Sequence, residues 1–298
     1  MDHWGIVVVC HMRDIDMLRL QARSLAVFMP AELVGQILVI ENDADGEVFA
    51  AAFASQVLPE YGLLAAHVTL IRREELAPGI SFAHGWRSQQ VLKMLATARI
   101  ATEHVLILDA KNHFIRPLTR SSYIAEDGRL RSYAVSQRGH LAQLFANSHA
   151  AFGLDPEPYF DRNLPNITPF PARPATIRGM ITKIEHHHAM TFAAFFLGRD
   201  VAEFYLLSAF LVARDGGPER EYSLGEPDVI TVFPDKAEAG AFEWVDFQLH
   251  RDAILCMGVH WAAIPLLSPA VRDRIVAFWQ ERGLVRDAKE GLSFLAAA

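Results

Sequence analysis

The chain has 298 residues, of which 51% are hydrophobic and 21% are charged, and its formal net charge is −7. This length and apolar content allow one large domain with a substantial core. The negative charge excludes a general basic surface for nucleic acid, so we expect no nucleic-acid partner.

The cysteines and the beginning of the chain indicate the compartment. Cys10 and Cys256 each lie in an apolar run and form no metal-type pair, so we expect both to be core thiols in a reducing environment. The first apolar run, residues 5–10, lacks the basic flank and the length of a secretion signal. We also expect no apolar run of the roughly 20 residues that a membrane span needs. A cytoplasmic protein is expected, with peripheral membrane association left open.

The first half of the chain alternates strand and helix patterns. Strands are predicted over residues 6–10, 36–40, 67–71 and 105–108, and helices over residues 14–28, 47–56 and 85–101. This order predicts an α/β fold with a mainly parallel, right-handedly connected sheet flanked by helices.

The second half is less regular. Prolines are dense between Pro156 and Pro174, which prevents a long helix and favours an ordered loop or a lid. A helix is predicted over residues 200–213, a strand over 254–259 and a closing helix over 268–282. No repeat or linker requires two independent domains, so we predict a single domain over residues 1–298.

The most informative stretch is Val-Leu-Ile-Leu-Asp-Ala-Lys-Asn-His-Phe, residues 105–114. Its apolar residues predict a strand covered on both faces, and its polar residues follow at the carboxyl end, where open parallel sheets bind ligands. Asp109 could hold a hard cation, and Lys111 could instead contact phosphate groups directly. An ordinary strand end whose polar residues only solvate a turn is the alternative.

Polar residues also follow the first two predicted strands. His11, Arg13 and Asp14 follow the first strand, and Asn42 and Asp43 follow the second. If these strands are neighbours, the loops line one crevice with a base and ribose near the first two and a diphosphate near the third. Each loop alone could instead cap a helix or form a turn, as Asp14 could for the helix after it.

The helix over residues 85–101 carries a second polar group. Gln89, Gln90 and Lys93 lie three and four residues apart, so their side chains can share a patch. That patch could recognise a donor, or it could be a solvated helix face with Lys93 exposed.

The triplet His186-His187-His188 has a plainer interpretation. Three consecutive imidazoles point in different directions, so we expect a polar helix end or an exposed loop and not a metal site. Glycine-rich phosphate motifs and a nucleophile elbow are absent from the sequence, which disfavours dehydrogenases, kinases and hydrolases.

Four motifs, taken in their order along the chain, resemble the pattern of a known family. They are Gly85-Trp86-x-x-Gln89-Gln90-x-x-Lys93, the stretch 105–114, Thr168-Pro169-Phe170-Pro171 and Ala202-Glu203-Phe204-Tyr205-Leu206. Together they resemble a bacterial glycosyltransferase-like family of formerly unknown function, similar in layout to the GT-A nucleotide-sugar glycosyltransferases. The resemblance covers roughly residues 5–285. It implies a GT-A-like, Rossmann-like domain with a nucleotide-sugar-binding half over 1–135 and an acceptor-side and closing half over 136–298.

The resemblance also implies a cation site. Asp109 matches the first acid of the family's Asp-x-Asp motif, and Lys111 stands where the second acid is expected. His260 is similar to a C-terminal histidine that completes the cation site in several GT-A enzymes. A divalent cation, Mn²⁺ or Mg²⁺, would then be held by Asp109 and His260. The alternatives are phosphate binding by Lys111 and a purely structural His260.

Glu203 matches the acid at the start of a helix in the family. It could accept a proton from an acceptor hydroxyl or hold that hydroxyl. The pattern Asp200-x-x-Glu203 is also a capping box, with Asp200 as the N-cap, which needs no substrate.

The implied activity is that of a hexosyltransferase-like glycosyltransferase. It would move a sugar from a nucleotide-sugar donor to a hydroxyl of a glycan or small-molecule acceptor, in the synthesis of bacterial surface or extracellular polysaccharides. The predicted catalytic residues are Asp109, Lys111 and Glu203, and the predicted donor-binding residues are His11, Arg13, Asn42, Gln89, Gln90, Lys93 and Asn112. The alternative is a non-catalytic nucleotide- or saccharide-binding protein on the same fold.

Overall fold

A five-stranded sheet lies at the centre of the protein. The computed structural model describes residues 3–79 and 85–296. Its central sheet has the order β3 (Val68–Arg72), β2 (Val34–Glu41), β1 (Trp4–Cys10), β4 (His104–Asp109) and β7 (Phe170–Ala172). The first four strands are mutually parallel, and β7 is antiparallel to β4. The predicted α/β architecture with a mainly parallel sheet is confirmed.

The inner strands β1 and β4 explain why apolar runs predicted strands well. Every residue of β1 is buried, and in β4 only Asp109 is partly exposed. A strand covered on both faces needs apolar side chains at successive positions. The register pairs Val9 with Asp109 and Cys10 with Glu41, so the carboxyl ends of β1, β2 and β4 lie side by side.

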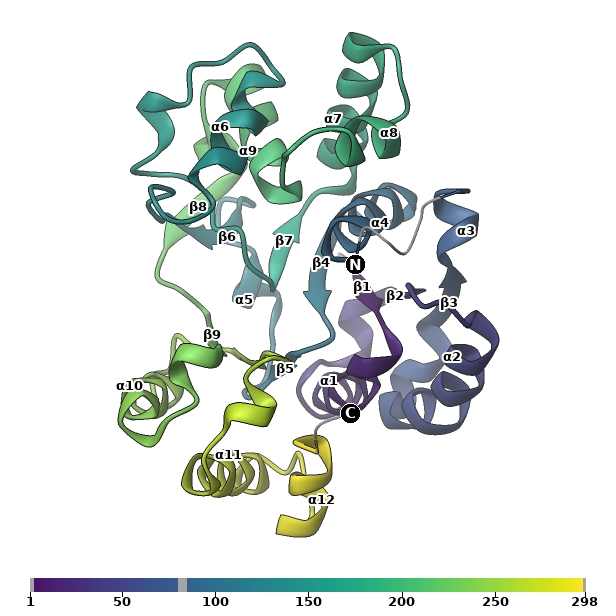
Figure 1. Ribbon diagram of the computed structural model, residues 1–298, viewed down its shortest axis with the longest axis vertical. Coiled ribbons are helices and arrows are strands. Elements are labelled where there is room, and N and C mark those ends of the chain that lie inside the picture. Colours follow the sequence, from purple (N-terminus) through teal and green to yellow (C-terminus); the bar gives the residue numbers. More distant parts are fainter. Residues whose placement is uncertain (1–2, 80–84, 297–298) are drawn as a thin grey trace.

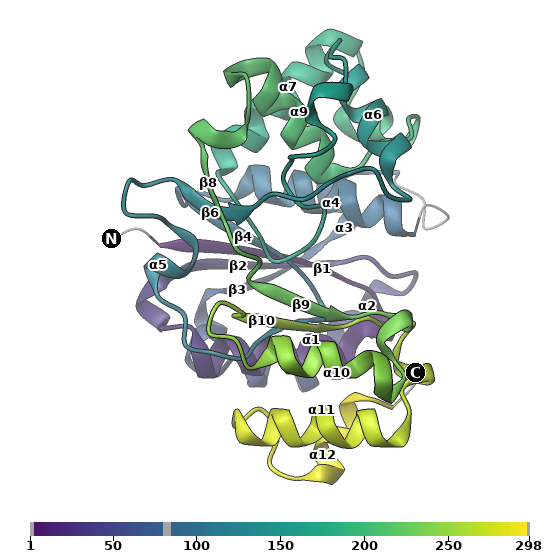
Figure 2. The same cartoon turned by 90° about the vertical axis from the view of Figure 1, so that its left-hand side faces the viewer.

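Helices cover both faces of this sheet, as Figures 1 and 2 show. On one side lie α3 (Arg73–Leu76), α4 (Trp86–Arg99), α6 (Ala142–Ala150), α7 (Pro174–His188), α8 (Phe192–Leu197) and α9 (Glu203–Asp215). On the other side lie α1 (Ile15–Phe28), α2 (Gly46–Ala52), α10 (Ala239–Leu249), α11 (Pro269–Glu281) and α12 (Ala288–Phe294). Residues after 135 therefore divide between the two faces instead of gathering in one place.

Short strands tie the later segments to the central strand. The strands β5 (Asn112–Phe114), β10 (Cys256–Val259) and β9 (Val229–Val232) form one small sheet, and β6 (Leu130–Tyr133) pairs with β8 (Tyr222–Gly225). A one-turn helix, α5 (Arg120–Tyr123), precedes β6. Because β10 pairs with β5, the C-terminal part returns to the end of β4.

The predicted helix over 47–56 is longer and less regular than expected. After α2 the chain continues as a π-helical turn at Phe53–Val57 and a 3-10 segment at Leu58–His67, which Gly62 interrupts with φ 52°. The combined stretch Gly46–His67 is long and apolar enough, by length and composition, to span a membrane. The expectation that no apolar segment reaches this length is therefore wrong. Tyr61 and Leu64 are buried within it, and core helices of water-soluble proteins meet the same criterion.

The start of α9 corrects one sequence prediction. The helix begins at Glu203, and its N-cap is Ala202 in an extended conformation, so Asp200 lies outside the helix and the predicted capping box is wrong. The closing helix was predicted well, because α11 has Ser268 as its N-cap and Gly283 follows with φ 70°. The short helix α12 beyond it was not predicted.

Candidate active site at the carboxyl edge of the sheet

The loops after β1 and β2 contact each other. Asp43 accepts a hydrogen bond from the backbone N–H of Met12 at 2.7 Å, and its carboxylate lies 3.3 Å from Nδ1 of His11. The Asn42 N–H donates to the Cys10 carbonyl at 2.9 Å. Two of the three predicted loops are therefore joined directly.

The loop after β10 adds a fourth wall. The Val259 N–H donates to the Lys111 carbonyl at 3.4 Å, so β10 ends beside the loop that follows β4. The guanidinium carbon of Arg13 lies 4.5 Å from the centre of the Trp261 ring, which joins this wall to the β1 loop. Trp261 is 47% exposed and was not among the predicted site residues. The signal that could have identified Trp261 is its position directly after His260 at the end of a predicted strand.

Four charged side chains form a chain of alternating sign at the end of β4. Lys111 contacts Oδ2 of Asp109, and Nζ of Lys93 lies 2.5 Å from Oδ1 of the same carboxylate. Nζ of Lys93 also lies 3.4 Å from Oε1 of Glu203. The side chains of Lys93 and Glu203 are 4% and 5% exposed, whereas those of Lys111 and Asp109 are 16% and 20% exposed. The accessible end of this charge chain is the Lys111–Asp109 end.

The pKa directions follow from burial and from these pairs. Burial favours the neutral form of Asp109, but the ammonium groups of Lys111 and Lys93 outweigh it and hold the Asp109 pKa well below its usual range. Burial alone would lower the pKa of Lys93, and Asp109 and Glu203 raise it instead. Burial raises the pKa of Glu203, with Lys93 acting against it. Asp109 and Lys93 are therefore both charged near neutral pH.

Two buried amides hold the loop after β4 in place. The Asn112 side chain is fully buried, accepts from the Asp109 N–H at 2.8 Å and donates to the Thr168 carbonyl at 3.1 Å. Gln21 of α1 donates to the carbonyls of Asp109 and Asn112 at 2.6 and 2.9 Å. Asn112 thus holds the loop after β4 through buried contacts, and its amide is not exposed to a nucleotide-sugar donor. Sequence reasoning missed Gln21, whose signal is a polar residue among the apolar positions of its helix.

The polar side chains of α4, which were predicted to bind the donor, mainly contact other protein groups. Gln89 donates to the Val9 carbonyl at 3.2 Å, and Oε1 of Gln90 accepts from the Glu203 N–H at 3.2 Å. Gln90 and Lys93 are buried, so the alternative of a solvated face is wrong for both. Nε2 of Gln90 and Oε2 of Glu203 are buried without a hydrogen-bond partner among the residues that the structure describes.

The residues around Asp109 do not fit the predicted divalent cation. Both carboxylate oxygens of Asp109 already contact ammonium groups. Nδ1 of His260 accepts from the Ala262 N–H at 3.2 Å, and burial followed by the charge of Lys111 lowers the His260 pKa. Over residues 3–79 and 85–296, no three or more His, Cys, Asp or Glu side chains form a group that could hold a metal ion. The Asp109–His260 metal site is therefore not supported.

His113 and His188 pack against aromatic side chains of the protein. Burial lowers the pKa of His113 to about 3, and its Nε2 accepts from the Trp279 indole N–H at 2.8 Å. His186, His187 and His188 form the last turn of α7, as the sequence indicated, and the ring of His188 stacks on Phe195. Cys10 and Cys256 are free and buried, as expected.

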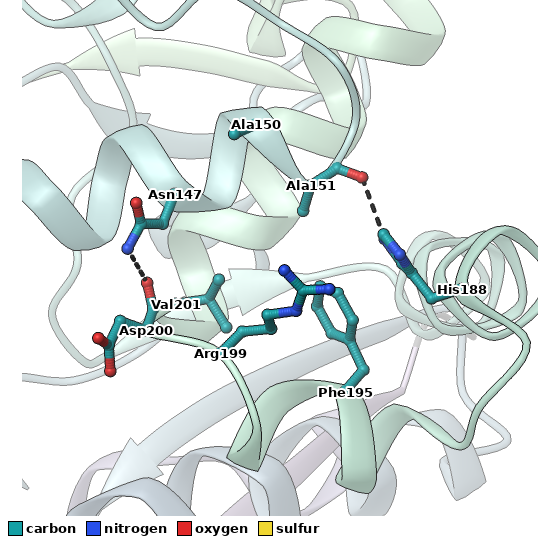
Figure 3. Close-up of a pocket in the computed structure, with 8 residues that line it drawn as sticks. All are labelled: Asn147, Ala150, Ala151, His188, Phe195, Arg199, Asp200 and Val201. Carbon is teal, nitrogen blue, oxygen red and sulfur yellow. Dashed lines mark hydrogen bonds between the residues drawn. The ribbon is translucent and has the colours of Figure 1, made fainter.

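A pocket of about 270 Å³ lies between α6, the end of α7, α8 and the segment before α9. Figure 3 shows the residues that line it. The pocket is lined by Asn147, Ala150, Ala151, His188, Phe195, Arg199, Asp200 and Val201. Asn147 donates to the Asp200 carbonyl at 2.8 Å. None of the predicted site residues lines this pocket, so it is separate from the charge chain around Asp109.

Comparisons with known proteins give a family and some structural likenesses. A family model described as a family of unknown function, DUF6492, matches residues 3–224. No curated protein matches the chain significantly.

Among solved structures, the galactosyltransferase LgtC in complex with donor and acceptor sugar analogs is similar, with 12% identity, 98% of this chain and 95% of LgtC covered, and a TM-score of 0.48. The glycosyltransferase GlyE of Streptococcus pneumoniae TIGR4 is similar with 12% identity and a TM-score of 0.42. That alignment covers 98% of this chain but only 62% of GlyE. At these scores the likeness carries no argument about activity.

Proposed function

The chain belongs to the DUF6492 family of unknown function, and we propose that it is a glycosyltransferase that moves a sugar from a nucleotide-sugar donor to an acceptor hydroxyl. Membership of that family confirms the resemblance to a family of formerly unknown function. The activity is proposed from the site itself.

One observation carries the proposal. The carboxyl ends of β1, β2 and β4 lie side by side, and the loop after β10 joins them, so one edge of the sheet gathers polar and aromatic groups from four distant segments. Open α/β sheets bind nucleotides at this edge. Lys111 is the more accessible lysine there, and an ammonium group binds phosphate as a point charge.

We place the donor across this edge. The diphosphate would lie against Lys111, and the base and ribose would lie near His11, Arg13 and Asn42. Trp261 is exposed beside Arg13 and would offer a flat face to a base. Gln89, Gln90 and Asn112 are engaged with protein groups and would support the donor site without contacting the donor.

The chemistry follows from these placements. The acceptor oxygen forms a bond to the anomeric carbon while the bond from that carbon to the diphosphate oxygen breaks. The electron pair leaves with the diphosphate, and the hydroxyl proton of the acceptor passes to an oxygen of that leaving diphosphate. Positive charge fixed beside the leaving oxygen stabilises this step. Asp109 would hold Lys111 at this edge before the donor binds, because its carboxylate contacts that ammonium group.

Glu203 has a changed role in this proposal. Its side chain is 5% exposed and pairs with Lys93. Burial against Lys93 favours a role in holding that lysine over a role as the proton acceptor for the incoming hydroxyl. Acceptance of the acceptor's proton by Glu203 stays a prediction, which the Glu203→Gln variant tests.

The wider setting also stays a proposal. We propose that the acceptor is a glycan or a small molecule and that the protein acts in bacterial surface or extracellular polysaccharide synthesis. We also propose a cytoplasmic location, with peripheral membrane association left open. The acceptor and the polysaccharide role rest on the family resemblance described from the sequence. The cytoplasmic location rests on the two core cysteines and on the first apolar run, which lacks the features of a secretion signal.

A second candidate is a non-catalytic nucleotide- or saccharide-binding protein. It is favoured by one observation, namely that Asp109 and Glu203 are both paired with Lys93, so neither carboxylate is free of an ion pair. Such a protein would bind a nucleotide sugar and return it unchanged.

The test is a panel of nucleoside diphosphates and nucleotide sugars. Binding to the full chain is measured by calorimetry, and release of nucleoside diphosphate is then followed with and without added glycans. Release that depends on an acceptor supports transfer. Binding without release supports the second candidate, and absence of binding across the panel refutes the donor site. For variants of Lys111, Lys289→Gln is the matched control for the loss of one positive charge, because Lys289 is exposed on α12.

A further inference from the structure

We infer that this chain neutralises the donor diphosphate with Lys111 and without a divalent cation, with Asp109 holding lysines and not a metal ion. This inference rests on the proposed function and names how its donor site handles charge.

The first step is the state of Asp109. One carboxylate oxygen contacts Lys111 and the other lies 2.5 Å from Nζ of Lys93. A divalent cation bound to this carboxylate would sit in direct proximity to two ammonium groups. To admit the cation, both lysines would have to move away from Asp109. Lys93, whose side chain is 4% exposed, would then keep Glu203 as its carboxylate partner, and Lys111 would lose the carboxylate that it contacts. Burying an uncompensated charge is strongly unfavourable.

The second step concerns the other acids at this edge. Asp43 is committed to the Met12 N–H and to His11, and the Asp14 carboxylate lies 3.5 Å from Nε of Arg13. Glu41 accepts from the Asp43 N–H. These carboxylates therefore already have partners in the loops after β1 and β2. The position two residues after Asp109, where a second acid would stand, is occupied by Lys111.

The third step is that the pairing suits an exchange. Lys111 is more exposed than Lys93, so Lys111 can turn from Asp109 to a phosphate oxygen. Asp109 then stays paired with Lys93 and no buried charge is left alone. The buried lysine thus compensates the carboxylate, and the exposed lysine is released for the ligand. This arrangement explains why two lysines share one carboxylate.

The test uses the full chain and calorimetric titration with uridine, guanosine, adenosine, cytidine and thymidine diphosphates. Each titration is done once in a chelator and once in MnCl₂. The binding nucleotide is expected to have the same affinity in both buffers to within about threefold, a difference of less than about 1 kcal/mol. Mn²⁺ alone, followed by electron paramagnetic resonance, is expected not to bind the protein.

Variants then identify the group that meets the phosphates. Lys111→Gln is expected to weaken binding in chelator by about tenfold or more, because a charge-assisted hydrogen bond is lost, whereas Lys289→Gln is expected to leave it unchanged. Lys111→Asp places a second acid two residues after Asp109, and nucleotide binding by this variant is expected to require Mn²⁺.

The outcomes separate this inference from the proposed function. Binding by the unaltered chain only in Mn²⁺ overturns the inference and leaves the donor site standing. Unchanged affinity of a folded Lys111→Gln also overturns it. No binding of any diphosphate in either buffer refutes both. The comparison of chelator with Mn²⁺ needs no variant, so it decides the question even if a variant fails to fold.

Discussion

Lys93 joins two carboxylates that are far apart in the sequence: its Nζ lies 2.5 Å from Oδ1 of Asp109 and 3.4 Å from Oε1 of Glu203. The lysine lies on α4, one carboxylate ends β4, and the other begins α9. A single buried ammonium group therefore connects the central sheet to the helices that cover one of its faces.

Loss of this ammonium group is expected to destabilise the fold. Lys93→Met leaves Asp109 with one partner and Glu203 with no cation that the structure shows, and breaking a buried pair costs about 3–5 kcal/mol. Urea denaturation of Lys93→Met and of the exposed control Lys289→Met measures the effect. A loss of less than about 1 kcal/mol in Lys93→Met would show that water or another cation compensates the carboxylates.

The stability contributed by Asp109 is expected to depend on pH. The Asp109 pKa is lower in the folded protein than in the unfolded chain, so the folded state binds fewer protons in acid. Its contribution is therefore complete above the unfolded value of about 4 and is lost as the pH falls below it. The difference in unfolding free energy between the natural chain and Asp109→Asn should shrink as the pH is lowered from about 6 to about 3, a range that includes the unfolded pKa. A difference that stays constant over this range would contradict the pairing.

Glu203→Gln distinguishes a holding role from a proton-accepting role. A glutamine oxygen can still accept a hydrogen bond from Lys93, but it cannot take a proton from an acceptor hydroxyl. We expect turnover to stay within about threefold of the natural rate while stability falls by about 1 kcal/mol. Rates and urea denaturation are measured on the same preparation. A fall of about a hundredfold in turnover at unchanged stability would restore Glu203 as the proton acceptor.

Gln21→Leu is expected to loosen the loop after β4. The substitution removes two hydrogen bonds to the carbonyls of Asp109 and Asn112 and leaves these buried acceptors with fewer partners. We expect a loss of stability of about 2 kcal/mol and weaker nucleotide binding, measured by denaturation and calorimetry. The control is Gln143→Leu, since Gln143 is exposed on α6. Nucleotide binding equal to that of the control would mean that the loop needs no support from α1.

Trp261→Ala is expected to separate base recognition from phosphate recognition. Removing the ring should weaken binding of a nucleoside diphosphate by about tenfold, because stacking on an aromatic face contributes about 1–3 kcal/mol per base. Binding of inorganic pyrophosphate should change little, because it has no base. Equal weakening of both ligands would place Trp261 away from the base.

The sequence analysis could predict the strands and their ends because these depend on local patterns. The apolar runs before His11, Glu41 and Asp109 each became a largely buried strand with a polar residue at its carboxyl end or directly after it. Parallel neighbours then bring those ends together whatever the intervening residues are.

The partners of Lys93 could not be predicted in the same way. Glu203 is 110 residues away, and neither side chain has a local signal that it is buried. The predicted start of the helix that corresponds to α9 was wrong for a related reason. Asp200-x-x-Glu203 has the spacing of a capping box, but the side chain of Arg87 donates to the carbonyls of Arg199 and Val201, and the chain before Glu203 stays extended. A contact from a distant helix overrode a local preference.

The return of β10 to the end of β4 brings a segment outside the family match beside a segment inside it. The family model ends at residue 224, whereas β9, β10, His260 and Trp261 all come later. Lys93, Asp109, Lys111 and Glu203 lie inside the matched residues, whereas the loop with His260 and Trp261 lies outside them. Under the proposed function, chimeras that exchange only the residues after 224 are therefore expected to change which base is bound while keeping the same response to added metal.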